Sequence, residues 1–167
     1  LNDGLCSQYA KLTAASGRWY DPDACLAQLD AGLAAVARGQ LLQARAMGDL
    51  HGDAGNGNFT FTLAAFLAIA GDASFYSYAD SSAHDCYELG FTPWRPEYDR
   101  PLGQPLALAE RRGDNGTLFK RSFAHGVDVM VDVYRGLAVI DWGGGARSVA
   151  GGAGAEALLQ RAWDGAG

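Results

Sequence analysis

Lysine and long apolar runs are scarce in this chain, and their scarcity argues against nucleic-acid-binding and membrane-spanning proteins. Only Lys11 and Lys120 are lysines, and the formal net charge is -6. A nucleic-acid-binding protein needs a basic face, which this composition does not supply. No stretch of about 18 consecutive apolar residues occurs, so the sequence predicts no membrane-spanning helix. We therefore expect neither nucleic acid nor a membrane span among its interactions.

Cysteine is also rare, and its count is odd. Cys6, Cys25 and Cys86 allow one disulfide in an oxidising compartment, with one thiol left free or intermolecular, and the sequence does not fix the pairing. The chain begins at Leu1 without a signal-peptide pattern, which predicts a mature product or a fragment. Two glycosylation sequons, at Asn58 and Asn115, mildly favour secretion. We therefore predict a secreted or extracellular protein with glycosylation at these two asparagines.

The residues that are abundant indicate a globular α/β protein. Apolar residues make up 49% of the chain and charged residues 19%, which is typical of a folded domain. A helix is predicted from the N-cap sequence at residues 21–23 to Gly39, followed by a buried strand at residues 40–47. A very apolar helix at residues 59–70 and a second strand at residues 73–79 come next. This alternation predicts α/β units with a parallel sheet.

Residues 117–142 carry the strongest pattern in the chain. Alternating valines predict a half-buried strand that pairs with residues 118–123 through a short loop, and a further strand at residues 137–142 completes an antiparallel meander. This register places Arg121 opposite Val129 on the buried face. An unpaired buried charge costs about 3–5 kcal/mol, so Arg121 must bind a carboxylate or carbonyl oxygens.

The remaining segments are rich in proline or glycine. Residues 92–105 contain four of the five prolines, which predicts an extended segment. Residues 143–154 are dominated by glycine and predict a flexible linker, followed by a short helix at residues 156–163. The predicted organisation is α/β units at residues 1–91, an extended segment and meander at 92–142, and a linker with a helix at 143–167.

Two motifs resemble a known family. The sequence W-R-P-E-Y-D-R-P-L-G-Q-P-L, followed by F-K-R-S-F-A-H-G-V-D-V-M-V-D-V, is similar to the C-terminal part of glycoside-hydrolase-like (β/α)8-barrel proteins. The resemblance covers about two thirds of the chain. The residues that carry it are Tyr98, Asp99, Pro101, Leu102, Gly103, Pro105, Arg121, Phe123, Gly126, Val129 and Val131.

The resemblance implies a fold and a function. A complete barrel runs to about 250 residues, so the chain has room for the last two or three units of a partial (β/α) barrel, followed by the antiparallel β-meander. The implied function is the C-terminal part of a secreted carbohydrate-active protein that shapes a sugar-binding cleft, with the main catalytic carboxylates outside this chain. Its partners would be carbohydrate and the missing N-terminal part, or another subunit. The alternative is a non-catalytic structural or carbohydrate-binding glycoprotein of an extracellular assembly.

Acidic loops follow the two predicted parallel strands. Glycoside hydrolysis uses two carboxyl groups about 5–10 Å apart, and Asp49 and Asp80 stand where adjacent strands would bring them together. His51, Asp53 and His84 lie in the same loops and are predicted to bind sugar hydroxyls. The simpler alternative is that these residues form ordinary turns, in which aspartate and glycine are common.

Trp94 and Tyr98 are the predicted stacking residues for a sugar ring, although large aromatics more often belong to the core. Metal binding is the alternative role for His51, Asp53, His84 and Asp85. Their loops lack the spacing of an EF-hand and its closing glutamate, so we predict no metal. No cofactor is predicted.

Overall fold

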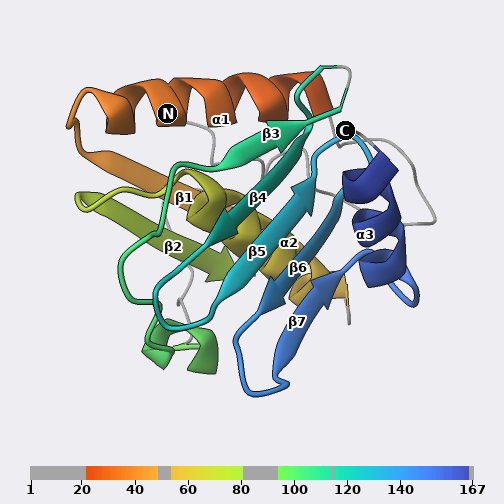
Figure 1. Cartoon of the computed structure of the whole chain (residues 1–167). Helices are drawn as coiled ribbons and strands as arrows, with labels where there is room; N and C mark the ends of the chain where they lie inside the picture. The colour runs from red at the N-terminus through yellow and green to blue at the C-terminus, as the bar shows by residue number, and fades with distance from the viewer. Residues whose placement is uncertain (1–21, 49–53, 81–93, 114, 166–167) are drawn as a thin grey trace.

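The computed structural model describes residues 22–48, 54–80, 94–113 and 115–165 (Figure 1). The elements follow one another as α1 (Pro22–Ala37), β1 (Leu42–Gly48), α2 (Ala54–Ile69), β2 (Ser74–Asp80), the 3-10 helix η1 (Pro96–Asp99), β3 (Glu110–Arg112), β4 (Leu118–Ser122), β5 (Asp128–Asp132), β6 (Leu137–Asp141), β7 (Arg147–Ala150) and α3 (Ala155–Gly165).

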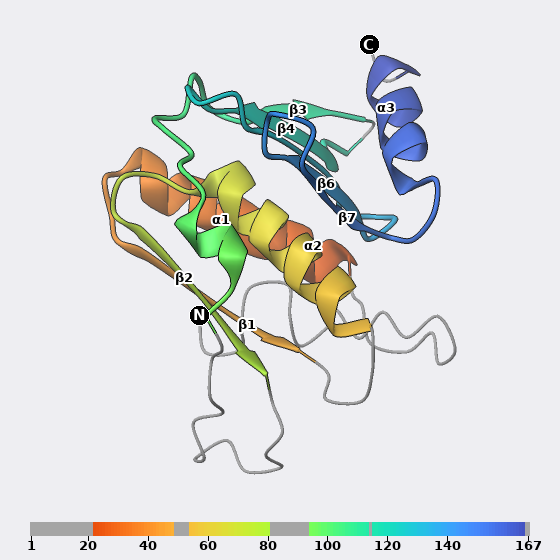
Figure 2. The same ribbon diagram turned by 90° about the horizontal axis from the view of Figure 1, so that it is seen from below.

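Helix α2 is the centre of the molecule. Every residue from 59 to 69 is buried, as expected for a helix that is apolar on all sides. One side of α2 contacts β1 and β2, and the other contacts the sheet that contains β4 to β7. Figure 2 shows α2 between the parallel pair and the larger sheet, with α3 on the far side of that sheet. The core is therefore a helix enclosed between two sheets.

Strands β1 and β2 form a parallel pair joined through α2. Their register runs from Leu42 opposite Ser74 to Gly48 opposite Asp80. The sequence predicted a buried strand here, but β1 buries only one face: Leu42, Ala44 and Ala46 are buried, and the residues between them are exposed. The period of two in β1 thus marks a sheet with one covered face.

The prediction of a partial (β/α) barrel is wrong. The described residues form a two-stranded parallel sheet and a five-stranded antiparallel sheet in the order β3-β4-β5-β6-β7. In a barrel, helices form an outer ring around the strands. Here the antiparallel sheet covers the side of α2 that a barrel would leave outside. The alternation of helices and strands describes the connections along the chain but not what packs on the second face of α2.

The meander has the predicted register. The backbone N–H of Phe123 donates to Val127 at 2.9 Å, and Arg121 pairs with Val129. The Arg121 side chain is 5% exposed, and its burial lowers the pKa of the guanidinium. Its Nε donates to Ala107 O at 3.2 Å, and its Nη1 donates to the carbonyl oxygens of Leu67, Ala68 and Ala70 at 3.1, 3.3 and 2.5 Å.

These bonds confirm the prediction that Arg121 binds carbonyl oxygens. Three of the acceptors lie at the C-terminal end of α2, where backbone carbonyls lack partners within the helix and carry negative partial charge. A cation in this position donates hydrogen bonds to these carbonyls and offsets their negative partial charge. Arg121 therefore ties the central helix to β4.

The glycine-rich stretch contains a strand that was not predicted. Gly143 to Gly145 have positive φ angles of 78, 61 and 87° and form the turn into β7, which pairs with β6. Helix α3 forms where a last helix was expected, and its Leu159 packs on Leu137 and Val139 of β6.

Cys25 lies in the core at 0% exposure and is disulfide-bonded. The other two cysteines of the sequence, Cys6 and Cys86, lie outside the described residues. Within the described part of the chain, no helix is long and apolar enough to cross a membrane.

Candidate functional site

A pocket lined by aromatic side chains lies where α2, β2 and η1 meet the end of β6. Its volume is about 510 Å³. We call it the aromatic pocket. Its aromatic members are Phe66, Tyr76, Trp94, Tyr98 and Trp142, and its polar members are Ser77, Glu97 and Arg100.

The proline-rich segment positions two of these aromatics. Arg95 is extended, as the residue before a proline should be, and Pro96 begins η1. The indole Nε1 of Trp94 donates to Asp99 Oδ2 at 2.9 Å, and the Trp94 ring meets Tyr98 edge-on with centroids 5.3 Å apart. Trp94 is nevertheless 71% exposed. It is held by directed contacts at the surface, so part of its ring is free to contact a ligand.

Tyr98 connects the exposed tryptophan to the core. Its ring centroid lies 5.8 Å from Phe59 and 6.3 Å from Tyr76. The Tyr98 hydroxyl is buried and has no hydrogen-bond partner among the described residues. Burial raises the pKa of Tyr98, against the lowering effect of Arg95. A buried unpaired hydroxyl costs about 1–3 kcal/mol, which a ligand hydroxyl or a water would offset.

Tyr76 differs from Tyr98 because its hydroxyl is paired. It lies 2.8 Å from Thr62 Oγ1. Burial raises the pKa of Tyr76 well above its ordinary value, and the bond to Thr62 opposes this shift. Tyr76 is thus a fixed, neutral wall of the pocket, and its ring stacks at a tilt against Phe66 with centroids 5.2 Å apart.

The pocket supplies one carboxylate in the part of the chain that is described, namely Glu97. The nearby carboxylate of Asp99 already accepts the indole N–H of Trp94. Hydrolysis of a glycosidic bond requires a pair of carboxyl groups. The arrangement therefore suits binding, and hydrolysis would need a carboxyl group from elsewhere.

Comparison with known families is decisive at this point. A family model described as "Hypothetical glycosyl hydrolase family 15" matches residues 10–127, well over half of the chain. The chain belongs to this family. No curated protein matches it. The sequence-based resemblance to glycoside-hydrolase-like proteins is confirmed to that extent, and a carbohydrate partner is consistent with membership of the family.

Of the two predicted catalytic residues, only Asp80 lies in the described part of the chain, at one end of the parallel pair. Asp80 ends β2 directly opposite Gly48, the last residue of β1. Asp80 is placed only by its backbone, and Asp49 lies outside the described residues. Their catalytic role remains a prediction.

The remaining predicted site residues divide between two groups. Trp94 and Tyr98 line the aromatic pocket together, as a sugar-stacking role requires. The predicted sugar-binding residues in the acidic loops, and the fourth residue considered as a metal ligand, lie outside the described residues: His51, Asp53, His84 and Asp85.

The two predicted glycosylation sites have different surroundings. Asn115 is exposed in the turn between β3 and β4. Asn58 lies within α2 and is followed by Phe59 and Thr60, which are 2% and 6% exposed. Glycosylation of either asparagine remains a prediction.

Sequence reasoning missed Glu97, Arg100 and Trp142 as lining residues of the pocket. Arg100 places its guanidinium 5.2 Å from the centre of the Trp142 ring. The two residues are far apart in sequence, and no local pattern predicts their contact. Only the cluster of tyrosine and tryptophan beside prolines signalled the site.

Proposed function

We propose that this glycosyl hydrolase-like protein binds a neutral carbohydrate chain in the aromatic pocket. The observation that carries the proposal is Trp94, which is 71% exposed and yet fixed by Asp99 and Tyr98. An exposed indole that is held in one orientation loses little conformational entropy when a ligand binds. The C–H face of a sugar ring is a suitable partner for such a surface.

The polar groups of the pocket match the hydroxyls of a sugar. Glu97 accepts hydrogen bonds, Arg100 donates them, and the unpaired Tyr98 hydroxyl can do either. A mostly apolar lining with a few placed polar groups is typical of a small-molecule site. The pocket thus combines a stacking surface with groups that orient the ring.

For an enzyme of this kind we propose main catalytic carboxylates outside this chain, with Asp49 and Asp80 as the candidates within it. The disulfide of Cys25 supports secretion, because disulfides persist in oxidising compartments. One observation favours the alternative of a non-catalytic carbohydrate-binding protein: Glu97 is the single carboxylate that the described residues supply to the pocket. The part of the protein described here shapes a sugar-binding surface under either proposal.

The test is calorimetric titration with three neutral hexasaccharides. Two are glucose chains, one in α-1,4 and one in β-1,4 linkage, and the third is a xylose chain. We expect one of them to bind and Trp94→Ala to weaken that binding by about 1–2 kcal/mol, or roughly tenfold in Kd. Phe75→Ala is the matched control, because Phe75 is 60% exposed on β2 but does not line the pocket. Equal affinity of the Trp94 and Phe75 variants would refute the proposal.

The same sugars separate the enzyme from the binding protein. Release of new reducing ends by the wild-type protein, abolished in Asp49→Asn or Asp80→Asn with binding retained, would support hydrolysis. Binding without any release of reducing ends would support the non-catalytic alternative.

A further inference from the structure

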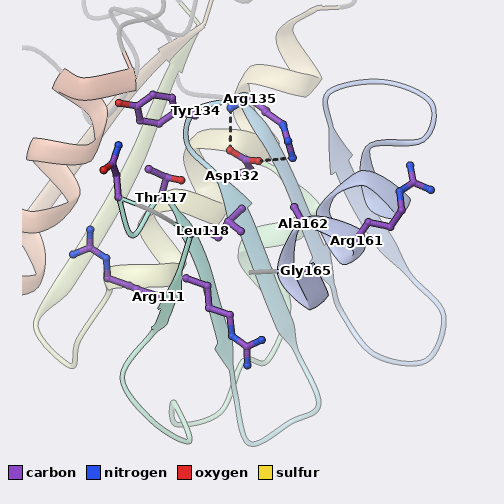
Figure 3. Close-up of a pocket in the computed structure, with 12 residues that line it drawn as sticks. Arg111, Thr117, Leu118, Asp132, Tyr134, Arg135, Arg161, Ala162 and Gly165 are labelled. Atoms are coloured by element: carbon purple, nitrogen blue, oxygen red, sulfur yellow. Dashed lines mark hydrogen bonds and ion pairs between the residues drawn. The ribbon is translucent and has the colours of Figure 1, made fainter. Parts of the chain in front are cut away.

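A second hollow lies at the other end of β6. It is formed by the turn between β3 and β4, the turn between β5 and β6, and the C-terminal half of α3, and its volume is about 850 Å³ (Figure 3). Four arginines line it, namely Arg111, Arg112, Arg135 and Arg161, so we call it the arginine pocket.

This concentration of positive charge stands against the character of the whole chain. The protein has a net charge of -6 and only 13 lysines and arginines. Four of these line one pocket, and Asp132 is the single acidic residue among its described lining residues. A positive pocket on an acidic protein attracts anions locally without making the whole surface basic.

The arginines of β3 are held in position by contacts that leave part of each guanidinium unused. Arg111 donates from Nε to Gly116 O at 3.0 Å and from Nη1 to Asp30 Oδ1 at 2.5 Å. Arg112 donates to Trp163 O at 3.2 Å, its guanidinium lies 4.4 Å from the centre of the Trp163 ring, and its Nη2 forms an ion pair with Glu110 at 4.0 Å. A guanidinium has five N–H groups, so each retains donors for a ligand.

The other two arginines are more exposed. Arg135 is paired with the buried Asp132, which accepts its backbone N–H at 3.0 Å and its Nη1 at 3.4 Å, but the Arg135 side chain is 58% exposed. Arg161 projects from α3 and makes no ion pair within the described part of the chain. Figure 3 shows Arg111 and Arg161 on opposite sides of the hollow. The positive charges are thus distributed around the pocket.

We propose that the arginine pocket binds an acidic carbohydrate, a sugar chain that carries carboxylate or sulfate groups. Separated guanidinium groups around a volume of this size suit several anionic groups along one chain better than a single small anion. Thr117 also lines the pocket and offers its hydroxyl to a sugar hydroxyl. The choice of a carbohydrate rests on the proposed function, whereas the preference for negative charge rests on the arginines alone.

The test compares the charge-reversal variants Arg161→Glu and Arg38→Glu of the whole chain. Arg38 is exposed just after α1, its guanidinium donates to Gln40 Oε1, and it does not line the pocket. The probes are oligogalacturonate for carboxylate groups and a chondroitin sulfate oligosaccharide for sulfate groups. We expect at least one probe to bind, Arg161→Glu to weaken it about tenfold or more, and Arg38→Glu to weaken it less than about twofold.

Two further arms define the ligand class. Added salt should steeply weaken binding of the acidic oligosaccharide and leave binding of the neutral hexaose nearly unchanged, because salt screens interactions between charges. Equal effects of the two substitutions would overturn the proposal. So would binding of single-stranded DNA of equal charge with the same affinity, which would show a general polyanion site. If the wild-type protein binds the acidic oligosaccharide but no neutral hexaose, the proposed function is refuted and the proposal for the arginine pocket is retained.

Discussion

The aromatic pocket and the arginine pocket lie at opposite ends of the same short strand. Trp142 follows the last residue of β6 and lines the first pocket, whereas Tyr134 and Arg135 precede β6 and line the second. A strand of five residues spans about 17 Å, so the two hollows are close neighbours on one sheet. Their chemistry differs completely, because one is lined by ring faces and the other by guanidinium groups.

The difference teaches how each hollow is held open. The aromatic pocket depends on α2, whose buried side chains Leu63, Phe66 and Leu67 form its floor. The arginine pocket depends on strand ends and on α3, and its side chains are fixed by ion pairs and by stacking on Trp163 and Phe119. Disturbing α2 should therefore damage the first pocket more than the second.

The largest effect is expected from Arg121→Met. This change removes the donor that satisfies three carbonyl oxygens at the end of α2, and it should lower the free energy of unfolding by about 3–5 kcal/mol. Neutral-sugar binding should weaken more than acidic-sugar binding in protein that remains folded. Urea denaturation measures the first quantity and calorimetry the second.

Arg45→Met is the matched control for Arg121, because Arg45 is exposed on β1 and a surface substitution of this kind changes stability by less than about 0.5 kcal/mol. If both variants lower the free energy of unfolding by the same small amount, the hydrogen bonds from Arg121 do not tie α2 to β4.

A smaller effect is expected from Asp99→Ala. Asp99 accepts the indole N–H of Trp94, and its removal should leave the ring free to rotate. Loss of one such bond is worth about 0.5–1.5 kcal/mol, so neutral-sugar affinity should fall about threefold while acidic-sugar affinity is unchanged. Asp72→Ala, at another exposed aspartate, should affect neither ligand. A parallel loss of both ligands would indicate a general disturbance of the fold.

The smallest effect concerns pH, at the aromatic end of β6. The backbone N–H of Gly143 donates to Asp141 Oδ1 and lowers the pKa of Asp141 below its ordinary value of 3.8, with help from Arg147. A lowered folded-state pKa contributes stability that is present above this ordinary value and is lost as pH falls below it. Asp141→Asn should therefore flatten the pH dependence of unfolding below about pH 4. An unchanged acid limb in this variant would count against the role of Asp141.

The parts of the fold that were predictable are those fixed by local periodicity. Alternating valines determine which face of β5 is buried, and that register alone places Arg121 inside and in need of acceptors. The parallel pairing of β1 and β2 also follows from the order of elements along the chain. Such patterns are visible in the sequence because the buried side chains of one element recur at a fixed spacing.

The parts that were not predictable depend on contacts between distant segments. A helix that is apolar all round signals burial but does not say that a sheet lies on each side, and this led to the mistaken barrel. The four residues of β7 are hidden among glycines that signalled a linker. The arginine pocket joins residues 111, 135 and 161, which share no local motif.

The most direct test of the central claim is the NMR signal of the Trp94 indole N–H during titration with the neutral hexaose that binds. The account predicts a saturable shift of the Trp94 signal, with a much smaller shift for Trp163, which is buried beside the arginine pocket. Asp99→Ala should alter the Trp94 signal before any sugar is added. Saturation of binding with the Trp94 signal unmoved would contradict carbohydrate binding in the aromatic pocket.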